Sequence, residues 1–140
     1  MSPLEQIEAE IGSIAGTREA AAERLLALAE EVLEHWIAAR GGDPTGGQVE
    51  GFRLLALHRQ GARGVPSFNA CRETCREIAY HYNLLTLEAP EDAEKRLAMM
   101  GMLVRHLALF VGGKLQVEGL GDLCCASRPV RQEQATIAKG

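Results

Sequence analysis

Apolar residues recur every three to four positions in five separate blocks of this chain, a spacing that is typical of amphipathic helices. The first block predicts a helix over about residues 3–15, with Pro3 at its first position. The second begins after Thr17, whose hydroxyl suits the N-cap, and ends at Gly41 and Gly42. Because the connections are short, neighbouring helices should run antiparallel in a single-domain, all-α bundle of about five helices.

The third and fourth blocks lie on either side of a loop rich in Gly and Pro. Asp43 and Pro44 offer an N-cap followed by proline, so the third helix is expected from there to Gly61, although three interior glycines weaken its start. Ser67 is expected to cap the fourth helix. The apolar stripe of that helix is Cys71, Cys75, Ile78, Tyr82 and Leu85.

The fifth block, Leu97 to Val111, is apolar on nearly every face, and only Arg105 and His106 are strongly polar. A helix of this kind is buried on all sides, so it is expected either at the centre of the domain or in a dimer contact. It is too short and too interrupted to resemble a membrane span. The side chains proposed for an interface are Met99, Met102, Leu103 and Phe110.

The segment after the fifth block carries a weaker pattern. Leu115, Val117 and Leu120 alternate with polar residues, which indicates a short strand or an extended loop. Residues 126–140 are polar and are expected to form a flexible tail, so the helical domain is placed at residues 1–125.

Composition agrees with a helical domain. Only 4% of the 140 residues are aromatic, so the core must be built mainly from Leu, Ala, Ile, Val and Met, which favour helices. The net charge of −4 gives no overall attraction for nucleic acid or an anionic membrane. The first residues lack a basic segment followed by an apolar run, so no signal peptide is expected. We therefore expect a cytoplasmic protein whose cysteines are thiols.

The four cysteines are the first candidates for chemistry. Cys71 and Cys75 share one helix face, where free cysteine most often acts as a small hydrophobic residue, and this structural interpretation is favoured. The adjacent pair Cys124 and Cys125 could join them in a four-thiolate site for a soft transition metal. A redox-sensing thiol pair is the other chemical interpretation. Otherwise no cofactor is expected.

Histidines and catalytic motifs add little support for an enzyme. His35, His58, His81 and His106 fall one to each of the last four helices and are expected on the surface or at its boundary, because helical spacing does not turn them towards one another. The chain has no phosphate-binding glycine loop, no nucleophile elbow and no His-Glu-x-x-His motif. An enzymatic activity is therefore not indicated.

Basic residues lie on both sides of the loop between the third and fourth helices. If the two helices crossed steeply, this could be a helix-turn-helix that reads DNA, but interleaved glutamates and a long loop argue for solvated helix faces. Nucleic acid is thus not the expected partner. The basic residues concerned are Arg53, Arg59, Arg63, Arg72 and Arg76.

The functional expectation rests on the fifth helix. Adaptable methionines on a helix that is more apolar than one small core needs are typical of a protein-binding surface. We expect a small regulatory or adaptor protein that acts by protein–protein binding as a homodimer. A cysteine-dependent metal-binding or redox-sensing module is the alternative, and a DNA-binding regulator is the third interpretation.

Overall fold

The computed structural model describes residues 3–11, 17–88 and 91–119. Helical residues make up 80% of this part of the chain, which contains no strand, so the predicted all-α bundle of five helices is confirmed. The elements are α1 Pro3–Ile11, α2 Arg18–Ala39, α3 Arg53–Ala62, the 3₁₀ helix η1 Pro66–Cys71, α4 Arg72–Leu87 and α5 Ala93–Val117.

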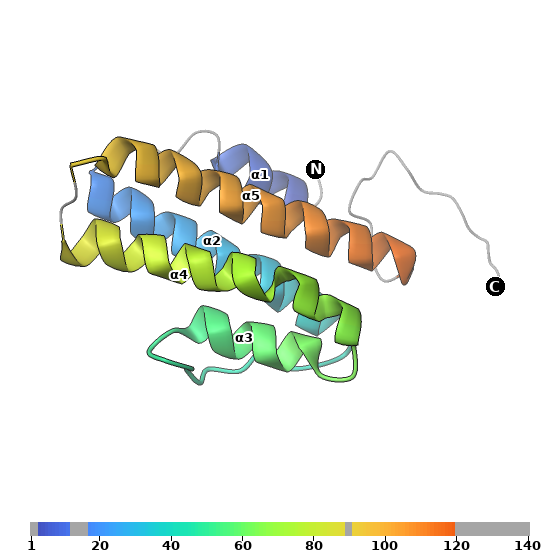
Figure 1. The fold of residues 1–140 in the computed structure, drawn as a ribbon. Coiled ribbons are helices and arrows are strands. Elements are labelled where there is room, and N and C mark those ends of the chain that lie inside the picture. The colour runs from blue at the N-terminus through green and yellow to red at the C-terminus, as the bar shows by residue number, and fades with distance from the viewer. Residues whose placement is uncertain (1–2, 12–16, 89–90, 120–140) are drawn as a thin grey trace.

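Three long helices, α2, α4 and α5, lie side by side and form the body of the bundle (Figure 1). α1 packs on α2 and α5, whereas α3 packs on α2 and α4. α4 runs antiparallel to α5, as the short connection between them requires. α2 and α3 run in the same direction, because residues 40–52 first lead the chain back along the bundle (Figure 1).

The start and the end of α2 follow the signals in the sequence. The Thr17 side chain accepts a hydrogen bond from the Ala20 amide over 3.1 Å, as an N-cap residue should. Gly41 follows the helix with a φ of 84°, a left-handed conformation that glycine adopts without strain. Both predicted boundaries of this helix are confirmed to within two residues.

The predicted start of the third helix is wrong. Val49 and Phe52 pair through two backbone hydrogen bonds of 3.0 and 2.9 Å, and between them Glu50 and Gly51 have φ values of 54° and 86°. Two successive positive φ values are those of a type I′ turn and cannot occur in an α-helix. α3 therefore begins only at Arg53.

Two other predicted boundaries are also corrected. Ser67 does not cap α4 but lies inside η1, because the chain first makes a 3₁₀ turn that places Phe68 in the core. α5 is helical through Val117, so Leu115 and Val117 form neither strand nor loop. Leu120, Ile14 in the predicted last turn of the first helix, and the expected tail lie outside the described residues.

The centre of the core is a contact between α2, α3 and η1. The indole Nε1 of Trp36 donates a hydrogen bond of 2.9 Å to the Gly61 carbonyl, and the Trp36 ring stacks on Phe68 with centroids 4.6 Å apart. Trp36 and Phe68 are the largest fully buried side chains among the described residues. A Cβ atom at Gly61 would lie 2.8 Å from Trp36 Cδ1, so only glycine fits this helix crossing.

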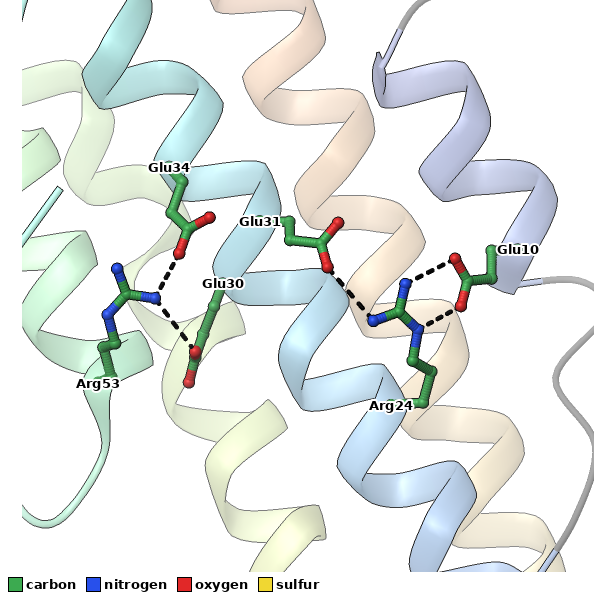
Figure 2. Close-up of polar contacts among 6 residues, drawn as sticks. All are labelled: Glu10, Arg24, Glu30, Glu31, Glu34 and Arg53. Atoms are coloured by element: carbon green, nitrogen blue, oxygen red, sulfur yellow. Dashed lines mark hydrogen bonds and ion pairs between the residues drawn. The ribbon is translucent and has the colours of Figure 1, made fainter. Parts of the chain in front are cut away.

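Two arginines fasten neighbouring segments to the polar face of α2 (Figure 2). Arg24 pairs with Glu10 of α1 and lies 3.3 Å from Glu31 of α2. Arg53, at the start of α3, pairs with Glu34 and lies 3.5 Å from Glu30. Such half-exposed pairs contribute little individually to the free energy of unfolding, and each links a neighbouring helix to α2.

Among the described helices, α5 is the one that is long and apolar enough to cross a membrane. The mean hydropathy of its most apolar window is 1.3, and 28% of that window is buried in the protein. Core helices of soluble proteins have the same length and composition, so this feature is weak support for a membrane span. The cytoplasmic location stays a prediction.

The packing around Gly61 makes a testable prediction. Gly61→Ala should lower the free energy of unfolding by about 1–3 kcal/mol, because the new methyl group meets the Trp36 ring and the core must shift. The matched control is Gly113→Ala in α5, where a Cβ meets no atom within 4 Å and should raise stability by up to about 1 kcal/mol. Urea unfolding followed by circular dichroism measures both changes, and equal effects would contradict this account of Gly61.

Candidate functional site

Cys71 and Cys75 lie together where η1 joins α4. Cys71 is the N-cap residue of α4, and Cys75 follows one helical turn later. Both side chains are buried, and each shifts the pKa of the other. They pack in the same core cluster as Ile78 and Leu85, which confirms that they belong to the apolar stripe of this helix.

The backbone carbonyl of Phe68 connects Cys71 to His58. The Cys71 thiol donates to this oxygen over 3.3 Å, and His58 Nε2 lies 3.1 Å from the same atom. A carbonyl can only accept, so Nε2 carries the proton and Nδ1 of the neutral ring is left as an acceptor. The imidazole also stacks on the Phe68 ring, with centroids 5.4 Å apart.

The two thiols differ in acidity. The hydrogen bond from Cys75 and then the nearby His58 lower the pKa of Cys71 to about 6, although burial opposes the shift. The interaction with Cys71, together with burial, raises the pKa of Cys75. The N-terminal end of α4 also favours negative charge on Cys71. Cys71 is therefore the first of the two to lose its proton, and its hydrogen bond to the Phe68 carbonyl exists only while it is protonated.

His58 also lines a cavity of about 650 Å³. One wall is the face of α3 that carries Leu55, His58 and Arg59, and the other is the first turns of α4 with Arg72 and Arg76. The type I′ turn at residues 49–52 forms part of the rim. The cavity is thus lined by basic side chains and lies next to a thiol of low pKa.

The basic residues predicted around this loop have separate roles. Arg53 faces away from the cavity and pairs with glutamates of α2 (Figure 2). Arg59, Arg63, Arg72 and Arg76 line the cavity instead. DNA recognition through these residues stays a prediction.

The expected surface positions are wrong for two of the four histidines. His58 and His81 are only 4% and 6% exposed, because α3 packs against three neighbouring elements and α4 against four. Burial lowers the pKa of His81, and nearby Arg96 adds to this. His35 is half-buried and His106 is exposed, in agreement with the prediction.

Among the described residues, no further metal-ligating side chains join the cysteine pair. Within residues 3–11, 17–88 and 91–119, no group of three or more His, Cys, Asp or Glu side chains is arranged to hold a metal ion. Cys124 and Cys125 lie outside the described residues. A four-thiolate site with Cys71 and Cys75 therefore stays a prediction.

The four predicted interface residues on α5 fall into two groups. Met99 and Met102 are 42% and 70% exposed. Leu103 and Phe110 are half-buried and pack against the core, where the Phe110 ring lies 5.7 Å from that of Phe68. One face of α5, which also carries Leu109, is not covered by the rest of the chain, so α5 is not a central helix surrounded by the others, and its burial in a dimer contact stays a prediction.

Sequence reasoning missed three parts of the site: the role of His58, the Phe68 carbonyl and the position of Glu50. The dipeptide Glu50–Gly51 between the apolar residues Val49 and Phe52 was the available signal, since glycine there suits a tight turn. The contact of His58 with η1 joins residues ten positions apart across a loop, and no local pattern marks it.

We compared the chain with protein-family models, with curated proteins and with solved structures, and found no match in any of the three. The residues of the site are therefore the basis for assigning a function.

The acidity of the thiol pair can be measured directly. In a variant with Cys124→Ser and Cys125→Ser, thiolate ultraviolet absorbance should rise with a midpoint near pH 6, because Cys71 loses its proton there. Cys71→Ser should remove this step. Cys75→Ala should move it to higher pH, since the largest cause of the lowered pKa is gone. A single step near the ordinary thiol pKa, about 8.5, would contradict the assignment.

Proposed function

We propose that this protein is a redox-sensing module whose Cys71 and Cys75 are oxidised to a disulfide by a hydroperoxide. The observation that carries the proposal is the placement of two buried cysteines one helical turn apart where η1 joins α4, with the lower pKa on Cys71. Redox-sensing cysteines combine thiolate character with a resolving cysteine nearby. Because Cys71 is only 1% exposed, the oxidant must be small.

The chemistry proceeds in two balanced steps. The Cys71 thiolate attacks the distal oxygen of the hydroperoxide ROOH, the O–O bond breaks, and the alkoxide leaves and takes a proton to become ROH. Cys71 is then a sulfenic acid. The Cys75 sulfur attacks Cys71 Sγ, the S–O bond breaks, and the proton of Cys75 leaves with the hydroxyl as water. Overall, two thiols and ROOH give one disulfide, ROH and water.

Closing this disulfide would move η1. In a regular helix the Cβ atoms of residues four apart are roughly 5–6 Å from each other, whereas a disulfide needs about 4 Å. Cys71 is the residue free to shift, because it lies at the junction of η1 and α4 rather than inside a helix. Its bond to the Phe68 carbonyl would break, and Phe68 would change its packing on Trp36.

Treatment with hydrogen peroxide tests the proposal. In the Cys124→Ser, Cys125→Ser background, each chain should lose two free thiols and two hydrogen atoms by mass spectrometry, and a thiol reductant should reverse both changes. Trp36 is the sole tryptophan of the chain, so its fluorescence should change with oxidation.

The matched control is Cys75→Ser, which keeps the reactive thiolate and removes the resolving thiol. It should stop at a sulfenic acid that a trapping reagent labels, with a smaller fluorescence change. Persistence of both thiols in the folded protein under excess peroxide would refute the redox function and leave the pair as packing residues.

A second candidate function is supported by the uncovered face of α5. Met102 and Leu109 are 70% and 59% exposed and lie seven residues apart, so they project from the same side of the helix. A helix of 25 residues is about 38 Å long, which is enough for a two-helix seam. We infer that a second copy of this chain packs here and that the homodimer acts as an adaptor.

Sedimentation of a charged variant tests this dimer. Met102→Lys should shift the protein towards monomer without loss of helical signal, because a lysine ammonium would be buried without a partner in the seam. The control is Leu87→Lys, an equally exposed leucine at the end of α4 that should leave the dimer intact. Sedimentation of the unaltered protein as a monomer at all concentrations would refute the dimer.

A further inference from the structure

The cavity beside His58 has the size and the lining of a ligand site. Its volume of about 650 Å³ falls within the range of roughly 300–1,000 Å³ that is typical of small-molecule pockets. Val49, Leu55 and Ala62 supply an apolar part of the wall. His58, which also lines the cavity, is more than nine-tenths buried.

The charge of the cavity is opposite to that of the chain. The whole protein carries a net charge of −4, yet the cavity is lined by four arginines and one glutamate. Arg72 and Arg76 lie one turn apart on α4, and Arg59 and Arg63 lie on the last turn of α3 and directly after it. A concave wall lined by one sign of charge concentrates ions of the other sign.

Three of these arginines form no ion pair with a carboxylate of the described residues. Among the described residues, no Asp or Glu lies within ion-pair distance of Arg59, Arg63 or Arg72. Arg24 and Arg53, outside the cavity, are each paired with two glutamates. The cavity therefore holds guanidinium groups whose donors are available to a ligand.

The one carboxylate at the rim shows how an anion fits. Both oxygens of Glu50 accept from Arg76, at 3.1 and 3.3 Å. Arg76, and more weakly Arg72 and Arg59, lower the pKa of the Glu50 carboxyl. Glu50 reaches this position with a φ of 54°, a strained value for a residue that is not glycine or asparagine.

We propose that this cavity binds a small molecule with a carboxylate or phosphate group, which displaces the Glu50 carboxylate from Arg76 and engages Arg59 and Arg72. Arginine is suited to this role because its planar fork makes paired, charge-assisted hydrogen bonds to such groups. The Glu50 side chain then acts as an internal competitor that a ligand must replace. This site is independent of the redox chemistry, since it needs neither cysteine.

A small molecule fits the site better than a nucleic acid does. Duplex DNA is read by an element that protrudes into a groove, whereas these arginines surround a hollow. Glu50 at the rim would also face the phosphate backbone. A DNA duplex therefore serves as a comparison ligand in the test.

Isothermal titration calorimetry with pyrophosphate and with citrate, at low ionic strength, tests the site on the full chain. At least one probe should bind with a Kd below about 1 mM, and the better of the two indicates a phosphate or a carboxylate ligand. Glu50→Gln should bind the probe several-fold more tightly because the competitor is gone, and Arg72→Gln should bind it roughly tenfold more weakly.

Two control variants make the same charge changes elsewhere. Glu91→Gln lies before α5, and Arg105→Gln lies on the exposed side of α5, so both should leave the affinity unchanged apart from the altered net charge. Circular dichroism of each variant verifies that it folds. Absence of binding for both probes, equal effects of Arg72→Gln and Arg105→Gln, or tighter binding of the duplex than of either probe would each overturn the proposal.

Discussion

The hydrogen bond from Trp36 to the Gly61 carbonyl is the constraint on which the rest of this structure depends. It requires that the end of α3 approach α2 closely, and glycine at position 61 permits that approach. The short distance brings the following loop over the indole, where Phe68 stacks on it. One polar contact inside an apolar core thus sets the positions of α2, α3 and η1 together.

The same constraint assembles the candidate site. Once Phe68 is held against Trp36, its backbone carbonyl points towards α3 and α4 and meets both His58 and Cys71. The Phe68 carbonyl is therefore one link between Cys71 and the packing around Trp36, in addition to the apolar contacts of both cysteines in the core. A shift of Cys71 would thereby reach the packing of Phe68 on Trp36.

Hydrophobic periodicity predicted the fold class and most of the helices, because it reports which side of each segment avoids water. It failed at positions where backbone conformation or a tertiary contact, rather than hydrophobic burial, determines the local structure. At Glu50 two positive φ values interrupt an apolar pattern that looks helical, and at Gly113 the helix continues through residues that usually end one. His58 was assigned to the surface because its partner, the Phe68 carbonyl, comes from a loop whose path no local pattern indicates.

The arginines of the candidate site could be located in the sequence, but their arrangement in the site could not be predicted from it. Their clustering was visible, but their separation into two groups depends on tertiary structure: Arg53 reaches the glutamates of α2, whereas Arg72 has no acidic neighbour within ion-pair distance among the described residues. In an acidic chain, carboxylates are abundant enough to pair every arginine. Among the described residues, Glu50 in its strained turn is the one carboxylate within ion-pair distance of the cavity arginines, and this supports the proposal of a place for an external anion rather than a solvated helix face.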